Sequence, residues 1–368
     1  MTTGLISRVF TGLALATATL VPLAPAHADS LEAEFDKAFT VKAVQARSQL
    51  QAPAKVAVKV LPSSESAQRV LPSNVRPFVA SSAPRAYGSN LDSQLAVQTD
   101  PANGRIGLAA IDLSTGRTVT VLGDTPFPMA STSKVAIVAT FLTGVDDGRF
   151  SLDASYPLMV PVKSKKYSSS VAPVRAGTML TGRQLIERTL IHSDNQATDA
   201  LLAVVGGPAA VNRWLRATGN SGLRLDRDIA TLVRDDGEYN PATMIDERDS
   251  ATPMAMARLL SGLYQGRWLS GDSRALLIST MERCATGKRR MRALLPSDAR
   301  VAHKTGTLSN TASDVGLVRT PDGRVYAMAI YVTGQGGHAG RDAKIAALAR
   351  TIYDGYQYDS SGYRVAAQ

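Results

Sequence analysis

The sequence has one cysteine, four histidines and few aromatic residues among its 368 positions, and these scarcities exclude several classes of protein. Cys284 is alone, so no intrachain disulfide can form and packing must stabilise the fold. The histidines lie far apart, without the spacing of metal ligands. Aromatic residues make up 5%, and they are not interleaved with basic residues as in proteins that read nucleic-acid bases. We therefore expect no metal, no organic cofactor and no nucleic-acid partner.

Long hydrophobic runs are also missing, except near the N-terminus. Residues 1–28 are typical of an export signal peptide, with Arg8, an apolar run and a small-residue cleavage site at 26–28. The run is short and is interrupted by Pro22 and Pro25, which makes a permanent membrane span the weaker interpretation. We expect a protein exported to a periplasm or to the medium, without a stable membrane span.

Positive charge is in excess, with a formal net charge of +10. Such a surplus can favour an anionic partner. The basic residues are nevertheless scattered, apart from two short clusters at 163–166 and 287–292. We interpret most of them as solvated surface charge and expect a monomer.

The segment 29–86, which follows the signal peptide, contains no glycine and several prolines. Apolar residues recur every three or four positions over 31–51, which predicts a helix. From residue 53 to residue 84 the composition predicts a linker. Its role stays open between a spacer, a pro-segment and a contact arm.

The catalytic domain is expected over 87–368, with strand patterns at its two ends and helical patterns between them. The expected elements are a helix over 90–98, a hairpin over 105–122, helices from 130 to about 285 with loops at 145–185 and 227–252, strands over 313–320 and 324–334, and a helix over 341–356. One antiparallel sheet built from distant segments follows, with a mostly helical region inserted into it. We predict an α+β fold with the active site at the seam.

A serine and a lysine stand three residues apart in "FPMASTSKVAI", at Ser131 and Lys134. On a helix they share one face, and Ser131 falls near the helix N-terminus, where free N–H groups favour negative charge. A lysine shielded from water loses its preference for the charged form and can act as a base for a serine nucleophile. Alone, however, most such pairs are a helix-cap serine beside a surface lysine.

Two further motifs follow in order along the chain. Ser193-Asp194-Asn195 enters a helical pattern, where these residues are also common as caps, and Lys304-Thr305-Gly306 precedes strand-like sequence. The three motifs together, over about residues 87–360, resemble class A serine β-lactamases and their penicillin-binding relatives. The neighbouring stretches "TGKRRMRALLP" and "DERDSATPMAMA" strengthen the resemblance.

The resemblance implies a chemical role for each motif. Ser131 would attack the carbonyl of a strained β-lactam and form an acyl-enzyme, while Lys134 assists removal of its proton. Ser193 would pass a proton to the lactam nitrogen, with Lys304 maintaining the electrostatics around it. The backbone N–H groups of Ser131 and Thr307 would form the oxyanion hole.

The same resemblance implies residues that hold the substrate. Asn195 would orient its amide, and Lys304 and Thr305 would receive its carboxylate. Gly306 would let the strand backbone approach the ligand closely. Arg290 matches the arginine that supports the carboxylate in some members, although it could also belong to the surface basic run at 287–292.

The loop "RDDGEYNPATMIDERD" over 234–249 departs from the family pattern. A gap-free alignment matches Arg234 and Asp249 to a bracing ion pair and Asn240 to a water-binding asparagine. It places Asp236, rather than glutamate, at the general base of deacylation. Aspartate is one methylene shorter, so we expect acylation to survive and deacylation to slow. Glu238 is the alternative base.

We therefore predict an exported serine hydrolase that opens β-lactams. Two alternatives stay open: a D-alanyl-D-alanine peptidase-like enzyme acting on wall peptides, and an acylating penicillin-binding or sensor protein without efficient turnover. The aspartate in place of glutamate is the feature that keeps both of them open.

Overall fold

One antiparallel sheet joins the two ends of the catalytic domain in the computed structural model, which describes residues 71–80 and 89–366. Its strands, in spatial order, are β10 (Arg300–Leu308), β11 (Thr311–Arg319), β12 (Val325–Thr333), β2 (Ile106–Asp112) and β3 (Thr118–Val121). Every neighbouring pair is antiparallel. The C-terminal strand β12 therefore lies directly beside the N-terminal strand β2, which confirms the expected α+β architecture.

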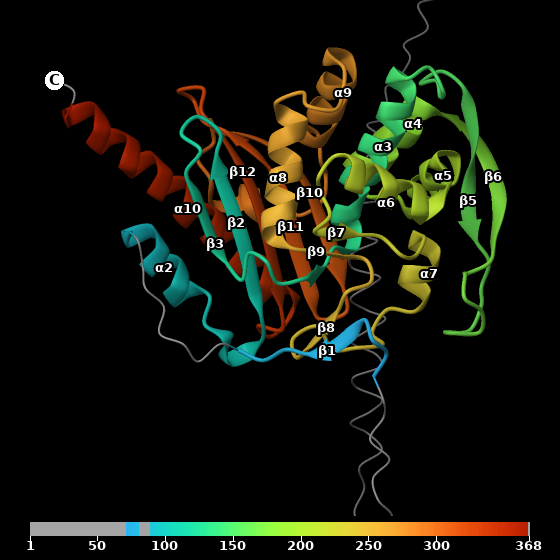
Figure 1. Cartoon of the computed structure of the whole chain (residues 1–368), viewed down its shortest axis with the longest axis horizontal. Helices are drawn as coiled ribbons and strands as arrows, with labels where there is room; N and C mark the ends of the chain where they lie inside the picture. The colour runs from blue at the N-terminus through green and yellow to red at the C-terminus, as the bar shows by residue number, and fades with distance from the viewer. Residues whose placement is uncertain (1–70, 81–88, 367–368) are drawn as a thin grey trace, which may run out of the picture. The chain divides into compact units, whose positions relative to one another are not determined.

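Helices cover both faces of this sheet, which explains why β11 and β12 are buried along almost their whole length. Helix α8 (Pro253–Tyr264) packs on one face, while α10 (His338–Ala366) and α2 (Asn90–Gln98) pack on the other. Figure 1 shows α2 and α10 on the side of the sheet away from the helical region. Two buried apolar clusters result, one between the sheet and the helical region and one beneath α10.

The helical region is inserted between β3 and β10. Its helices are α3 (Lys134–Asp146), α4 (Gly182–Ile191), α5 (Asn195–Val205), α6 (Gly207–Ala217), α7 (Ile229–Arg234) and α9 (Gly271–Glu282). Helix α3, with sequence KVAIVATFLTGVD, is apolar around its circumference and almost wholly buried. Such a pattern is typical of a central helix, and it fixes the residues at the start of α3 firmly between the sheet and the other helices.

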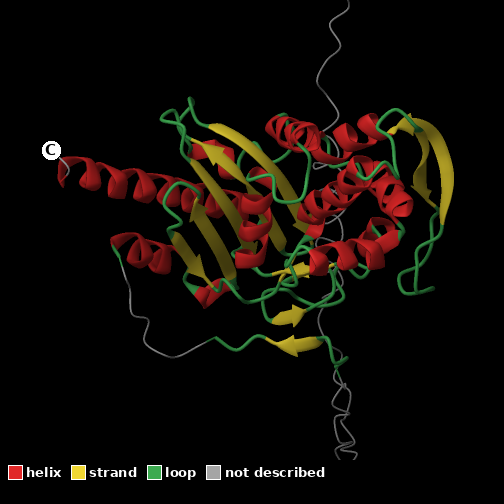
Figure 2. Cartoon of the chain, turned by 45° about the horizontal axis from the view of Figure 1, so that its top comes forward, coloured by secondary structure: helices red, strands yellow, loops and turns green. Residues whose placement is uncertain are grey.

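The expectation of loops at 145–185 and 227–252 is wrong in part. The first contains the hairpin of β5 (Ser155–Pro161) and β6 (Val174–Thr181), which lies at the edge of the helical region (Figure 2). Its residues are mostly exposed and a bulge interrupts the pairing, so apolar alternation is weak. The second contains α7 and the short strands β8 (Met244–Asp246) and β9 (Ser250–Ala251). Strand β9 joins β4 (Phe127–Pro128) and β7 (Leu223–Arg224) in a small sheet.

Part of the predicted linker contacts the catalytic domain. Strand β1 (Val75–Pro77) pairs with β8, so residues 71–80 contact the domain rather than merely precede it. The predicted signal peptide 1–28, the predicted helix 31–51 and the rest of the linker lie outside the described residues. None of the helices in the described part of the chain is long and apolar enough to cross a bilayer.

Candidate active site

The residues of the first motif lie where the sheet meets the helical region. Ser131 is half-buried in a short 3-10 turn, Ala130–Ser133, and Lys134 begins α3 directly after it. Ala130 has a φ of 49°, a conformation that non-glycine residues seldom adopt. A strained residue directly before a serine at a helix N-terminus is typical of a functional position.

The buried Lys134 side chain points to the second motif. Its Nζ donates to the carbonyl oxygen of Ser193 at 2.5 Å, to Ser193 Oγ at 3.1 Å and to Asn195 Oδ1 at 2.7 Å. Ser193 also has a positive φ, 58°, and Asp194 fixes this turn by capping α5. Lys134 therefore contacts the Ser193-Asp194-Asn195 motif directly.

The third motif approaches Ser193 from the sheet. Lys304, buried on β10, donates from Nζ to Ser193 Oγ at 2.9 Å and to the carbonyl oxygen of Thr305 at 2.9 Å. The Ser193 hydroxyl thus lies between two buried lysines. Burial lowers the pKa of Lys134 well below its usual value, and the positive charge of Lys304 lowers it further. This environment favours a neutral Lys134 amine, the form that can accept a proton.

Gly306 is required for the close contact between β10 and the turn that carries Ser131. A Cβ at this position would lie 2.6 Å from the carbonyl oxygen of Met129 and 2.5 Å from Ser313 Oγ. Both distances are far below a van der Waals contact. The structure therefore gives Gly306 a packing role that the sequence did not reveal, since its neighbour is the protein's own backbone.

Arg290 is buried rather than part of an exposed basic run, whereas the side chain of its neighbour Arg289 is 71% exposed. Arg290 Nε pairs with Asp342 at 2.7 Å, and its other nitrogens donate to Gly306 O at 3.0 Å and Thr307 Oγ1 at 2.7 Å. It therefore lies behind the end of β10. From there it supplies positive charge to the strand that carries Thr307.

Asp236 and Asn240 lie against the turn between β10 and β11. The Asp236 carboxylate accepts the backbone N–H of Ser309 at 2.8 Å, and Asn240 Oδ1 accepts from Asn310 Nδ2 at 2.9 Å. Lys166 donates to the Asp236 carbonyl oxygen. Burial raises the pKa of Asp236 despite the bond from Ser309. In the part of the chain that the structure describes, the hydrogen bonds of the Asp236 side chain therefore lead to β10–β11 and not to the first motif.

A cavity beneath the loop has Asp236 in its wall. Other residues in the wall are Pro128, Glu238, Leu308 and Ser309. Ser131 and Lys134 do not line it. The cavity adjoins the motif residues without containing them.

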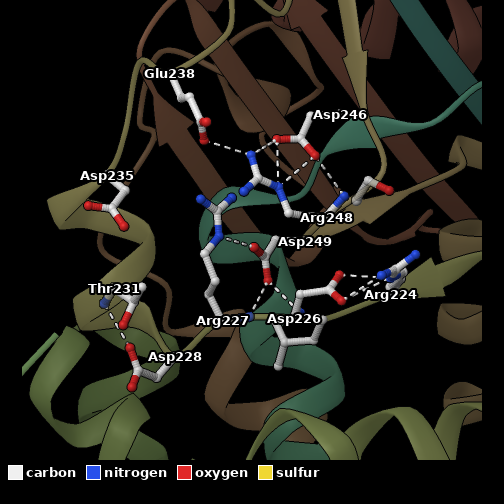
Figure 3. Close-up of polar contacts among 12 residues, drawn as sticks. Arg224, Asp226, Arg227, Asp228, Thr231, Asp235, Glu238, Asp246, Arg248 and Asp249 are labelled. Carbon is white, nitrogen blue, oxygen red and sulfur yellow. Dashed lines mark hydrogen bonds and ion pairs between the residues drawn. The ribbon is translucent and has the colours of Figure 1, made fainter. Parts of the chain in front are cut away.

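The predicted ion pair between Arg234 and Asp249 is wrong. Asp249 pairs with Arg227 at 2.6 Å, as Figure 3 shows, while Arg234 pairs with its neighbour Asp235 at 2.8 Å. Helix α7 separates the two arginines, because Arg227 precedes it and lies beside Asp249, whereas Arg234 is its last residue and lies beside Asp235.

Glu238, the alternative base for deacylation, is bound by a second arginine of the loop. It pairs with Arg248 at 2.7 Å, and Arg248 also pairs with Asp246 (Figure 3). This ion pair directs the Glu238 carboxylate at Arg248. Its orientation favours a structural function for Glu238.

A buried polar cluster behind Lys304 was missed from the sequence. His303 Nδ1 lies 2.9 Å from Asp314 Oδ1, and Cys284 contacts the same histidine. Burial opposes the charged imidazolium, but Asp314 and Cys284 raise the pKa of His303 to about 10. Burial likewise opposes the thiolate, yet the contact with His303 lowers the pKa of Cys284 to about 6. The three residues come from separate segments, so no sequence motif marks them.

Asp199 on α5 is a further buried acid that the sequence did not single out. Its carboxylate accepts the backbone N–H groups of Ile229 at 2.7 Å and Ala230 at 2.9 Å. Burial raises its pKa to about 7. Asp199 thereby attaches the start of α7 to α5, the helix that begins at Asn195.

The site contains no cluster of metal-binding character. Over residues 71–80 and 89–366, no group of three or more His, Cys, Asp or Glu side chains could hold a metal ion. The charged groups that converge on Ser193 are two lysines, Lys134 and Lys304.

The fold and the three motifs define a class A-type serine hydrolase, in which a half-buried serine lies in the turn before a helix whose first residue, a buried lysine, contacts a second serine. A model of the family described as "Beta-lactamase enzyme family" matches residues 90–356. The chain belongs to that family.

Individual relatives agree with this assignment. The β-lactamase CTX-M-8 of Citrobacter amalonaticus is 33% identical over 74% of this chain and 91% of that relative. A β-lactamase of Mycobacterium tuberculosis is 33% identical over 71% of this chain and 83% of its own length. Among solved structures, an ancestral class A β-lactamase is 35% identical with a TM-score of 0.62, over 72% of this chain and all of that chain.

Proposed function

We propose that this protein opens the β-lactam ring by hydrolysis, through an acyl-enzyme on Ser131. The observation that carries the proposal is the Ser193 hydroxyl held between Lys134 and Lys304, beside the turn that presents Ser131. Two buried ammonium groups this close favour loss of one proton. The arrangement supplies a base and a proton donor in one network.

Acylation begins when the neutral Lys134 amine takes the proton of Ser131 Oγ. The oxygen then attacks the lactam carbonyl carbon, and negative charge develops on the carbonyl oxygen. The backbone N–H groups of Ser131 and Thr307 receive that charge, at the N-terminal end of α3 and on β10. Removal of one such donor typically slows a reaction by about a hundredfold or more.

Ring opening requires a proton on the leaving nitrogen. As the C–N bond breaks, the Ser193 hydroxyl donates its proton to the nitrogen and is reprotonated from Lys134, which carries the proton taken from Ser131. Lys304 keeps this hydroxyl oriented and favours its deprotonated form during the transfer. The proton thus moves from one serine to the lactam nitrogen without entering bulk water.

Substrate binding uses the end of β10. Lys304 and Thr305 face the substrate carboxylate, and Asn195 orients the amide of the side chain. Arg290 adds positive charge through its bond to Thr307. A β-lactam, or a wall peptide of similar shape, satisfies this set of donors.

Deacylation depends on Asp236 as the general base for the attacking water. Asp236 is bound to Ser309 N, so it must exchange this bond for the water before it can act. That requirement favours a second candidate function, an acylating protein that releases its product slowly, as a penicillin-binding sensor or a peptidase relative does with β-lactams. Export through the segment 1–28 fits either function, since β-lactams and wall peptides meet such proteins outside the cytoplasm.

Steady-state assay with a chromogenic cephalosporin tests the proposal. The purified protein should hydrolyse many equivalents, and Ser131→Ala should abolish the reaction. A burst of one equivalent followed by arrest supports the slow-release candidate. No colour change with the parent protein, together with no adduct on it, contradicts both.

A further inference from the structure

Strand β1 and its flanks, residues 71–80, form a strap on the loop that carries Asp236. Val75, Arg76 and Pro77 pair antiparallel with Asp246, Ile245 and Met244. Beyond the strand ends, Phe78 N donates to Thr243 O at 2.8 Å and Glu247 N donates to Asn74 O at 2.9 Å. Figure 1 shows β1 alongside β8. The pairing therefore extends over the whole segment 243–247.

Burial gives this small ribbon a stability that two strands alone lack. Val75 is 4% exposed and Ile245 is 1% exposed. The guanidinium of Arg105 lies over the ring of Phe78, 5.2 Å from the ring centre. The same buried guanidinium donates to Pro241 O at 2.8 Å and to Met244 O at 3.2 Å. The loop backbone is thus held by the strap and by Arg105 together.

Side chains continue the connection from the strap toward the proposed base. Asn74 Nδ2 donates to Asp246 Oδ1 at 3.3 Å, and Asp246 pairs with Arg248. Arg248 in turn pairs with Glu238 at 2.7 Å, close in sequence to Asp236. A continuous series of polar side-chain contacts therefore connects the strap to the part of the loop that borders the cavity.

The opposite side of the loop contacts the sheet. Asp236 and Asn240 bond to Ser309 and Asn310, as described above. The loop is fastened at the β10–β11 turn through residues 236–240 and at the strap through residues 243–247. Loss of the strap leaves the loop positioned by the β10–β11 turn, by Arg105 and by the Arg227–Asp249 pair, without the backbone pairing at 243–247.

We infer that the strap is a positioning element for deacylation, set on the loop from a segment that precedes the catalytic domain. The inference rests on the proposed function of Asp236. Acylation uses Ser131, Lys134 and Ser193, none of which touches the strap, so it should not depend on these contacts. Deacylation should depend on them, because a misplacement of about 1 Å can slow a reaction by about a hundredfold.

Two variants at one position separate backbone pairing from side-chain loss. Antiparallel pairs alternate between bonded and non-bonded positions, and the bonded pairs 74/247 and 78/243 place Arg76 and Ile245 at a bonded position between them. Arg76→Pro removes the N–H used there. Arg76→Ala keeps it and removes only an exposed side chain whose ion pair with Glu247 is long, at 3.8 Å.

Both variants of the full chain are compared with the parent in pre-steady-state assays and by hydrogen exchange. In Arg76→Pro the deacylation rate constant should fall at least tenfold, with the acylation rate constant within twofold of the parent. The amides of 243–247 should exchange faster. Arg76→Ala should match the parent in all three measurements.

The outcomes separate failure of this inference from failure of the proposed function. Unchanged or faster deacylation in Arg76→Pro overturns the inference, as does an equal fall in both rate constants. If the parent forms no acyl-enzyme, the proposed function fails and the kinetic role of the strap fails with it. Exchange at 243–247 then still shows whether the strap fixes the loop, and unchanged exchange refutes that structural claim too.

Discussion

Asp249 binds Arg227 in two ways, through an ion pair at 2.6 Å to Nε and through the backbone N–H of Arg227, and it also accepts the backbone N–H of Asp226. Its carboxylate is 2% exposed and its backbone has a φ of 48°. Arg227 precedes α7 and Asp249 precedes β9, so the pair closes the base of the whole loop. It joins the segments on which the position of Asp236 depends.

Arg227→Ala should destabilise the protein by about 3 kcal/mol, because it leaves the buried Asp249 carboxylate without its cation. Arg234→Ala should have a smaller effect, since Arg234 pairs with its sequence neighbour Asp235 and its other hydrogen bonds are to the exposed Ser169. Urea unfolding of both variants provides the comparison. An equal loss of stability in both variants, or a larger loss in Arg234→Ala, would instead support the Arg234–Asp249 pair that the sequence predicts.

Lys134→Ala should slow acylation by at least a hundredfold, because it removes the group that accepts the Ser131 proton. The matched control is Lys163→Ala, in which an exposed lysine near the hairpin end of β5 is removed. Stopped-flow measurement of acyl-enzyme formation distinguishes them. Fast acylation in Lys134→Ala would assign the base to another residue.

Asp236→Glu should speed deacylation, because the longer side chain can reach a water near the acyl carbonyl while its backbone stays in place. Glu238→Gln serves as the control and should leave deacylation within a few-fold, since Glu238 is engaged with Arg248. Acyl-enzyme decay followed by mass spectrometry measures both. A slower Asp236→Glu combined with a strongly impaired Glu238→Gln would identify Glu238 as the base.

The His303–Asp314 pair should make stability depend on pH. The pKa of His303 is raised to about 10, so its charged form stabilises the folded state fully below pH 6.5, and this contribution is lost as the pH rises through 10. Asp314→Asn should therefore lower the free energy of unfolding more at pH 6 than at pH 10. Urea unfolding at both values measures the difference.

His303→Gln is the control for that experiment. It lacks the titrating group, so adding Asp314→Asn to it should cost about the same at both pH values. If Asp314→Asn lowers the free energy of unfolding equally at both pH values while His303 is present, the histidine is neutral in the folded protein.

The sequence was sufficient for the sheet and for the three motifs. Ser131, Ser193 and Lys304 each belong to a short motif with other diagnostic residues, and the strands that surround them have clear apolar patterns. Local sequence was also enough to place α2 at the residues expected for it. The motifs, the helix α2 and the individual strands are marked by residues only a few positions apart, which a pattern can reveal.

The loop and its attachments depend on distant contacts, and the sequence did not reveal them. Arg227 and Asp249 are 22 residues apart, with α7 and β8 between them, so no local pattern pairs them. Strand β1 is three residues long and ends in Pro77, so its composition resembles a linker until β8 is placed beside it. The buried character of Arg290 depends on Asp342, which comes from the C-terminal helix.

Peptide mapping of the acylated protein tests the central claim most directly. The purified protein is mixed with a β-lactam, quenched within the first turnovers, digested and analysed by mass spectrometry. We expect a mass increase equal to one intact β-lactam, confined to the peptide that contains Ser131 and absent in Ser131→Ala. An adduct on any other residue, or hydrolysis by Ser131→Ala at the parent rate, would contradict it.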